Sequence, residues 1–272
     1  MTDCFHYEAI AKMIDHTLLD PALTTSELED GCALAARYDL ASVCILPYYL
    51  MRCAELLAET TVHASTAIGF PDGGQRTAIK VAEARQALKD GGRELDVVIN
   101  ISKVRSGDWQ YVNDELLALT QTIHAEGAQI KVIFQNACLD DASKMFLCEI
   151  CGTIGVDWVE TVSGHSPAEA NLSEIELMRR YSPERVQVKA GTGIHNLDAL
   201  LAARAMGASR VATTRTESIL KECRRRLQRP YLAQTGAVKG NENSALPPGR
   251  VPFIVERQRI AGTLMTKERI RK

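Results

Sequence analysis

The stretch Gly127-Ala-Gln-Ile-Lys-Val-Ile-Phe134 decides the fold of this chain, because it joins the end of a helix to the start of a buried strand. Glycine is favoured just past a helix C-terminus, where it enters the left-handed region without the penalty of a Cβ atom. The β-branched run that follows is almost continuously apolar, which is typical of a parallel strand covered on both faces. The same pattern recurs at residues 92–99, 155–162 and 207–213.

Weaker segments extend this pattern to eight strand–helix units. We predict strands at residues 13–17, 41–46, 62–69, 95–100, 130–135, 157–162, 185–190 and 209–213. We predict helices at residues 26–37, 48–58, 75–90, 109–126, 140–153, 168–180, 196–206 and 215–226. This count indicates an α/β protein with a single-domain (β/α)8 TIM barrel. A doubly wound open sheet is the alternative, but no Gly-x-Gly-x-x-Gly motif follows the first strand.

The end of the chain differs from the rest in composition. We expect the barrel to occupy residues 1–226 and an extension to occupy residues 227–272. Residues 234–250 are rich in Gly, Asn, Ser and Pro, which is typical of a linker. Residues 251–255 have the pattern of a short strand, so both disorder and docking remain open for the extension.

Composition and charge exclude several classes of protein. The chain of 272 residues has 32 basic and 34 acidic side chains, and this near-neutral balance argues against a nucleic-acid binder. No apolar run approaches the roughly 20 residues that span a bilayer, and the N-terminus lacks the pattern of a signal peptide. Eight cysteines in a chain of this length suit a reducing compartment, and the C-x-x-C of Cys148 and Cys151 has no second pair to complete a zinc site. We therefore expect a cytoplasmic protein without a metal, a nucleic-acid partner or a membrane partner.

Four charged residues interrupt the apolar strand patterns: Asp96, Lys131, Glu160 and Lys189. A charge is expensive to bury on an apolar strand unless it is paired. Because they fall on four consecutive strands, and because barrels of this kind carry their catalytic groups at strand C-terminal ends, these residues are the candidate catalytic groups. An inert ion-pair network, or side chains that point outward, is the alternative.

The loops after the last three predicted strands are candidates for binding phosphate. Glycine exposes backbone N–H groups, and Asn196 is placed to cap the next helix, so the loop 189–195 has the features of an anion site. Loops at the end of the seventh and eighth strands commonly hold phosphate in these barrels. An ordinary glycine-containing turn is the alternative. The candidate phosphate-binding residues are Gly164, Gly191, Thr192, Gly193, His195, Thr213, Thr214 and Arg215.

Six motifs together resemble the deoxyribose-phosphate aldolases over about residues 8–222. They are Ile14-Asp-His-Thr-Leu18, Val43-Cys-Ile-Leu-Pro47, Ala67-Ile-Gly-Phe-Pro-Asp-Gly-Gly74, Glu94-Leu-Asp-Val-Val-Ile-Asn100, Ile130-Lys-Val-Ile133 and Val188-Lys-Ala-Gly-Thr-Gly-Ile194. The resemblance implies a barrel without metal or organic cofactor. It also implies cleavage of 2-deoxyribose 5-phosphate to acetaldehyde and glyceraldehyde 3-phosphate through a lysine Schiff base. Along these motifs we assign Asp15, Thr17, Cys44, Asn100 and Gln135 to the pocket, and we expect Cys44 to be a buried thiol. Asp15 and His16 end the first strand, where they either reach the pocket mouth or have a structural role.

This chain departs from the family at its reactive centre. The family reads close to Lys-Thr-Ser-Thr-Gly on the sixth strand, and the first lysine forms the Schiff base. Here the stretch is Glu160-Thr-Val-Ser-Gly164, so a carboxylate stands in place of the nucleophile and cannot form an imine. The family's Glu-Thr pair after the fifth strand becomes Gln135-Asn136, and the basic residue closing its phosphate loop becomes His195.

Three functions remain open from the sequence. The first is an aldolase-like carbon–carbon lyase acting on a small phosphorylated or polyhydroxy aldehyde, with Lys189 or Lys131 as the nucleophile. The second is an isomerase, epimerase or non-imine lyase that uses Glu160 as general base. The third is a barrel that binds a sugar phosphate without catalysis. In each case we expect a homo-oligomer, a dimer or higher.

Overall fold

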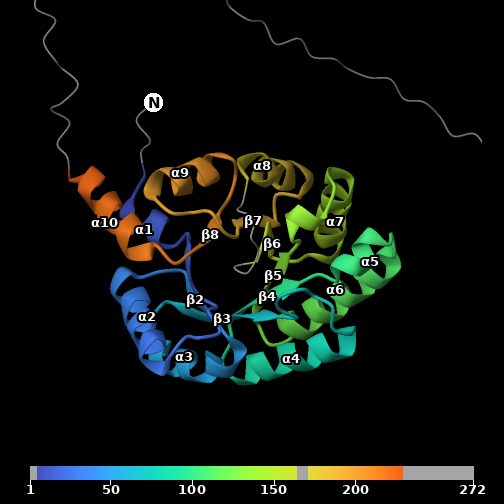
Figure 1. The fold of residues 1–272 in the computed structure, drawn as a ribbon, viewed down its shortest axis with the longest axis horizontal. Helices are drawn as coiled ribbons and strands as arrows, with labels where there is room; N and C mark the ends of the chain where they lie inside the picture. Colours follow the sequence, from blue (N-terminus) through green and yellow to red (C-terminus); the bar gives the residue numbers. More distant parts are fainter. Residues whose placement is uncertain (1–4, 164–170, 229–272) are drawn as a thin grey trace, which may run out of the picture. The chain divides into compact units, whose positions relative to one another are not determined.

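The computed structural model describes residues 5–163 and 171–228, and these residues form the predicted (β/α)8 barrel. Eight parallel strands close in sequence order at the centre, and helices surround them (Figure 1). The strands are β1 (Ile14–Leu18), β2 (Ser42–Ile45), β3 (His63–Ile68), β4 (Glu94–Val98), β5 (Gln129–Ile133), β6 (Trp158–Glu160), β7 (Gln187–Ala190) and β8 (Arg210–Thr213). The prediction of a barrel rather than an open sheet is confirmed.

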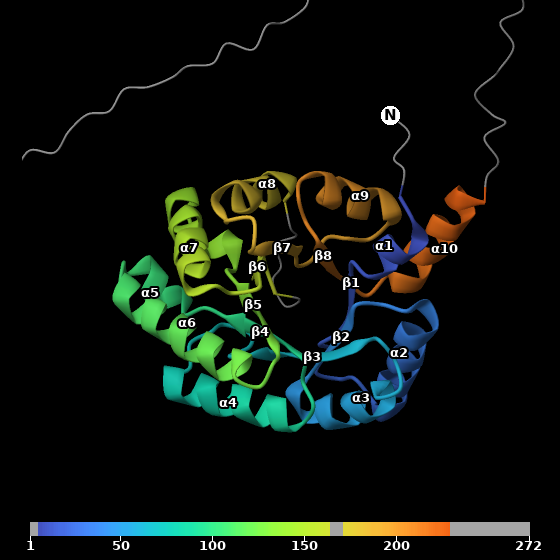
Figure 2. The same ribbon diagram turned by 180° about the vertical axis from the view of Figure 1, so that it is seen from behind.

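Each predicted helix is present, although the helix predicted at 168–180 is seen only from Leu172 onward. The helices that cover the barrel are α2 (Thr25–Tyr38), α3 (Leu50–Leu57), α4 (Thr77–Lys89), α6 (Trp109–His124), α7 (Asp141–Ile154), α8 (Leu172–Tyr181), α9 (Leu197–Ala205) and α10 (Thr216–Leu227). Four further short elements were not predicted: α1 (Tyr7–Ala11), η1 (Pro47–Tyr49), α5 (Ile101–Arg105) and η2 (Asn136–Cys138). They have five residues or fewer, which is too short for a helical period to show in the sequence. α1 lies beside α10, as the reverse view also shows (Figure 2).

Local signals in the sequence begin and end these helices. Gly127 follows α6 and has a φ of +69°, which lies in the left-handed region. Its N–H donates to the carbonyl of His124 at the end of α6. At the other end of a helix, Thr24 and Glu27 form a capping box on α2. Asn196 accepts from the N–H of Ala199, so the predicted cap of α9 is confirmed.

Side chains alternate between two environments along each strand. Residues of one parity, such as Leu95 and Val97 on β4, join the apolar core between the sheet and the helices. Residues of the other parity, such as Glu94 and Asp96, fill the barrel interior. Branched apolar side chains usually fill the interior of such barrels. Here the interior is rich in charged side chains, and this difference positions the candidate site.

Two predictions concern parts of the chain that the structure does not describe. The extension predicted at residues 227–272 begins at the last residue of α10 and lies, from residue 229 onward, outside the described residues. Gly164 also lies outside them.

Within the described ranges, no helix is both long enough and apolar enough to cross a membrane.

The loop after β3 depends on close packing at Gly73. Its φ is +67°, and a Cβ atom built there would lie 1.7 Å from the carbonyl oxygen of Ile99. Gly127 has nearly the same φ, +69°, but a Cβ there would meet nothing within 4 Å. We expect Gly127→Ala to lower the free energy of unfolding by about 1 kcal/mol, the cost of a left-handed alanine. Gly73→Ala should cost clearly more in urea denaturation, and equal costs would contradict this packing.

Candidate active site

The barrel register places the four predicted charges next to one another. Asp96 pairs with Lys131 across β4 and β5, and Glu160 pairs with Lys189 across β6 and β7. All four side chains are buried inside the barrel. The alternative that they point outward into the helix layer is therefore wrong, whereas a role in catalysis remains a prediction.

Lys189 lies among three carboxylates. Its Nζ is 2.6 Å from Asp96, 3.0 Å from Asp15 and 3.2 Å from Glu160. Burial alone would lower the pKa of Lys189, but the negative charges of these neighbours raise it well above its ordinary value. Lys189 is therefore held as an ammonium ion, which is a hydrogen-bond donor and not a nucleophile.

Lys131 is surrounded in the same way but lies deeper in the barrel. Its Nζ is 2.6 Å from Glu94, 2.9 Å from Asp96 and 3.2 Å from Asp15. These carboxylates raise the pKa of Lys131 above its ordinary value despite its burial. Lys131 lines neither of the two pockets described below.

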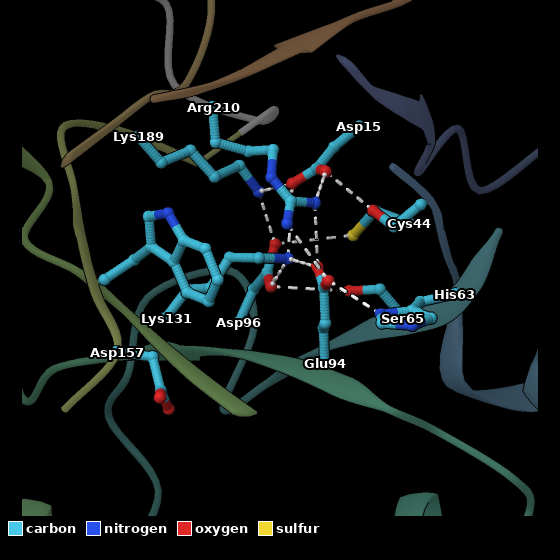
Figure 3. Close-up of polar contacts among 12 residues, drawn as sticks. Asp15, Cys44, His63, Ser65, Glu94, Asp96, Lys131, Asp157, Lys189 and Arg210 are labelled. Atoms are coloured by element: carbon cyan, nitrogen blue, oxygen red, sulfur yellow. Dashed lines mark hydrogen bonds and ion pairs between the residues drawn. The ribbon is translucent and has the colours of Figure 1, made fainter. Parts of the chain in front are cut away.

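Two members of this network, Glu94 and Arg210, were not singled out from the sequence. Arg210 donates to Asp15 at 2.7 Å and to both carboxylate oxygens of Glu94, and its guanidinium lies over the ring of Trp158. The cations Lys131, Lys189 and Arg210 all point toward the same group of carboxylates (Figure 3). Burial alone would raise the pKa of Glu94, but the charges of Lys131 and Arg210 and the hydrogen bond with His63 lower it to about 2. The signal for Glu94 is its position two residues before Asp96, which places both on one face of the strand.

Glu160 differs from Glu94 and Asp15 in that its carboxyl group has a raised pKa. Burial raises its pKa to about 8, and the attraction of Lys189 only partly offsets this effect. Its Oε2 lies 3.2 Å from Lys189 Nζ without hydrogen-bond geometry, and no other described residue donates to that atom. The raised pKa means that Glu160 keeps its proton to a higher pH than an ordinary glutamate.

Two pockets meet at the carboxyl ends of the strands. The inner pocket is a narrow cavity of about 10 Å³ that reaches Asp96, Glu160 and Lys189. Its other lining residues are Thr17, Leu19, Cys44, Ala67, Phe70, Ile133, Ser163 and Ala212. The outer pocket, of about 120 Å³, is lined by Thr17, Ala212 and the two loops after β7 and β8. Thr17 and Ala212 line both pockets, so the two are neighbours.

The outer pocket gathers most of the predicted phosphate-binding residues. Its walls include Gly191, Thr192, Gly193, His195, Thr213 and Thr214. Some polar groups of these walls bond to other parts of the protein. The N–H of Gly191 donates to Thr161 Oγ1, and Thr213 Oγ1 donates to the carbonyl of Ile194, which ties the loops after β7 and β8 together. Arg215 lies at the N-terminus of α10 and does not line this pocket.

The predicted pocket residues are not all at the pocket. Thr17 and Cys44 line the inner pocket, and burial raises the pKa of the Cys44 thiol well above its usual range. Asp15 is fully buried below it in the ion-pair network, and Asn100 caps α5. The expectation that His16 can reach the pocket mouth is wrong. His16 has the opposite parity to Asp15, so it faces the helix layer, where its Nδ1 lies 2.9 Å from Thr216 Oγ1.

Gln135 connects the loops that border the inner pocket. Its side-chain amide donates to Ser163 Oγ at 2.6 Å and to the carbonyl of Pro71 at 3.2 Å, and its Oε1 accepts from the N–H of Ser163. Its backbone is left-handed, with a φ of +55°, which is uncommon for a residue with a side chain. Ser163 and Phe70, next to Pro71, both line the inner pocket, so Gln135 braces two of its walls.

Within the described part of the chain, no group of three His, Cys, Asp or Glu side chains is arranged to hold a metal ion.

The fold and site are those of a (β/α)8 barrel with ionisable groups at the carboxyl ends of its strands. Residues 9–145 match the family described as DeoC/LacD family aldolase. A deoxyribose-phosphate aldolase of Rhodopirellula baltica is 52% identical over 231 residues, which cover 85% of this chain and 96% of that protein. The chain therefore belongs to the DeoC/LacD aldolase family.

Other relatives and solved structures agree with this assignment. A deoxyribose-phosphate aldolase of Caldanaerobacter subterraneus subsp. tengcongensis is 38% identical and covers 78% of this chain and 93% of its own. The crystal structure of a putative deoxyribose-phosphate aldolase from Coccidioides immitis has a TM-score of 0.77 at 30% identity, with 80% of this chain and 87% of that chain covered. A deoxyribose phosphate aldolase from Aeropyrum pernix, described as a unique tetrameric structure, has a TM-score of 0.75 at 26% identity, with 80% and 92% covered.

The raised pKa of Glu160 predicts a pH-dependent effect of Glu160→Gln on stability. Between the ordinary glutamate pKa and about 8, the folded protein keeps this proton and the unfolded chain loses it, so the wild type loses stability as the pH rises. Glutamine stays neutral throughout. The variant should match the wild type near pH 4, gain on it progressively up to about pH 8, and keep the advantage above that. Urea denaturation across this range measures the difference, and exposed Glu126→Gln is the control. A difference independent of pH would contradict the assignment.

The bracing role of Gln135 predicts a loss of stability in Gln135→Glu. An ionised glutamate keeps the shape of the side chain but cannot donate to Ser163 Oγ or to the carbonyl of Pro71. We expect the free energy of unfolding to fall by roughly 1–3 kcal/mol, the cost of leaving buried polar groups unpaired. Gln121→Glu, on the exposed face of α6, should have little effect. Equal urea midpoints for the two variants would show that these hydrogen bonds of Gln135 do not stabilise the fold.

Proposed function

We propose that this protein is a carbon–carbon lyase that cleaves a small phosphorylated hydroxyaldehyde without an imine intermediate. The observation that carries the proposal is the pair Glu160 and Lys189, which lie 3.2 Å apart and line the same inner pocket. One is an acid able to exchange a proton near neutral pH, and the other is a fixed ammonium ion. The pair provides the two functions that a retro-aldol cleavage requires, namely a base and an electrophile.

Glu160 is proposed as the general base and acid. In its ionised form it accepts the proton of the hydroxyl group on the carbon β to the substrate carbonyl. The bond between the α and β carbons then breaks, the β carbon becomes an aldehyde, and the electron pair moves through the α carbon to the carbonyl oxygen as an enolate. The protonated Glu160 returns the same proton to the α carbon. The cycle gives two carbonyl compounds and leaves Glu160 ionised.

Lys189 is proposed to stabilise the enolate. Asp96 and Asp15 keep its amine protonated, so it presents a positive charge to the developing negative charge on oxygen. Such fixed donors are effective because they need no reorganisation during the reaction and act in a site sheltered from water. Asp96, whose carboxylate accepts from both Lys189 and Lys131, is proposed to fix the position of the ammonium group.

The outer pocket is proposed to bind the substrate phosphate. It adjoins the inner pocket through Thr17 and Ala212, so a substrate with a carbonyl at one end and a phosphate at the other would span both. Glycine-rich loop backbone and the N-terminus of α9 favour an anion there. Among the proteins compared above, those named deoxyribose-phosphate aldolase support 2-deoxyribose 5-phosphate as the first substrate to test. The tetramer described for the Aeropyrum pernix protein supports our expectation of a homo-oligomer.

The test is the pH dependence of 2-deoxyribose 5-phosphate cleavage. Because Glu160 must be ionised to accept the hydroxyl proton, kcat/KM should rise with pH and level off above about pH 8. Glu160→Gln should lower kcat by roughly 10²–10⁴-fold, the usual contribution of a general base. Exposed Glu126→Gln should leave kcat and KM unchanged.

Borohydride treatment in the presence of substrate separates the remaining functions. We expect no reduced adduct on any lysine while acetaldehyde is still released. An adduct at Lys189 would replace the proposed mechanism with a Schiff-base aldolase. Saturable binding of the sugar phosphate without turnover would instead support a non-catalytic barrel.

A further inference from the structure

The ion pair of Glu94 and Arg210 is linked by ion pairs to the charged groups around Glu160, although neither residue lines the inner or the outer pocket. We propose that Glu94 and Arg210 are positioning residues that set the ionisation of Glu160 through the charge balance of the barrel interior. This inference deepens the proposed function, because it assigns what controls the proposed acid and base.

The first step of the argument is the balance of charge. The interior holds three cations: Lys131, Lys189 and Arg210. It also holds four carboxyl groups: Asp15, Glu94, Asp96 and Glu160. Three carboxylates neutralise three cations, so the fourth carboxyl group is surplus and keeps its proton. Glu160 is that group, because it has a single cation within ion-pair distance, whereas each of the other three has at least two.

The second step is a continuous path of contacts from the pair to Glu160. Arg210 holds one oxygen of Asp15 at 2.7 Å, and the other oxygen of Asp15 lies 3.0 Å from Lys189, which contacts Glu160. Glu94 lies 2.6 Å from Lys131, which contacts Asp96 and through it Lys189. All these side chains are buried, so water and salt screen their charges little.

The groups that face Glu160 come from five strands. They are Lys189 on β7, Asp96 on β4, Lys131 on β5, Asp15 on β1 and, more weakly, the thiol of Cys44 on β2. Neither Glu94 nor Arg210 is among them, so the pair can be altered without removing a direct neighbour of Glu160. His63 contacts Glu94 at 3.0 Å from the rim, where its side chain is about half exposed.

The two members of the pair should act in opposite directions. Glu94→Gln removes an anion, so Glu160 becomes the third carboxylate and should ionise at lower pH. Arg210→Met removes a cation, so Glu160 should ionise at higher pH. In that variant Glu94 still contacts Lys131 and His63, and Asp15 still contacts both lysines, so Glu160 still has the fewest cations near it and should be the last of these groups to ionise. The double variant restores the balance and should titrate like the wild type.

The experiment follows the Glu160 carboxyl carbon by NMR in protein labelled with ¹³C at the glutamate side-chain carboxyl, assigned by the signal lost in Glu160→Gln. We expect midpoint shifts on the order of one pH unit, downward in Glu94→Gln and upward in Arg210→Met. Arg210→Lys keeps the charge and should titrate like the wild type. Glu115→Gln disrupts the buried Lys80–Glu115 pair, which has no contact with the network, and should not move the midpoint.

Each outcome decides the inference. Unmoved midpoints, or shifts in the same direction for both single variants, would overturn it, because a merely structural pair cannot produce opposite shifts. If Arg210→Met does not fold, Arg210→Lys and the Glu94→Gln midpoint still test it. The titration needs no substrate. Opposite midpoint shifts in a protein that does not cleave 2-deoxyribose 5-phosphate would support the inference and contradict the proposed function. Cleavage of that substrate with unmoved midpoints would support the proposed function and contradict the inference.

Discussion

The structure depends on the balance of charge inside the barrel. Apolar side chains normally fill this space, and each unpaired charge buried there would cost several kcal/mol. Lys131, Lys189 and Arg210 are therefore stable only beside an equal number of carboxylates. This requirement explains why Asp15 is fully buried below the inner pocket and why Glu94 and Asp96 follow each other on one face of β4. It also leaves Glu160, whose pKa burial raises to about 8, as the carboxyl group of this network in excess of the cations.

The fold could be predicted from the sequence because its signals are local. At four places a glycine follows a helix and a largely apolar run follows the glycine within about eight residues, as at Gly127–Phe134. Repetition of that unit fixes the topology, since parallel strands joined by helices are limited to few arrangements. The short helices α1 and α5 were missed because five residues contain little more than one turn.

The site could be predicted only in part because it depends on register. The sequence shows that Asp96, Lys131, Glu160 and Lys189 are charges on strands, and their convergence follows from the barrel. It does not show depth, so Lys131 and Lys189 looked equivalent, although only Lys189 reaches the inner pocket. Because the parity of β1 was equally hidden, the sequence left open whether His16 reaches the pocket mouth or has a structural role. Arg210 could not be recognised without knowing that β8 brings it next to Lys189.

The same balance explains what a glutamate at position 160 does to an aldolase barrel. With the lysine that the resemblance implies at this position, the interior would hold four cations and three carboxylates, and the surplus positive charge would favour the neutral, nucleophilic form of one amine. With Glu160 the surplus has the opposite sign, so a carboxyl group keeps its proton and every lysine in the network stays charged. Under the proposed function, this single difference would replace an amine that attacks a carbonyl by an acid that exchanges a proton.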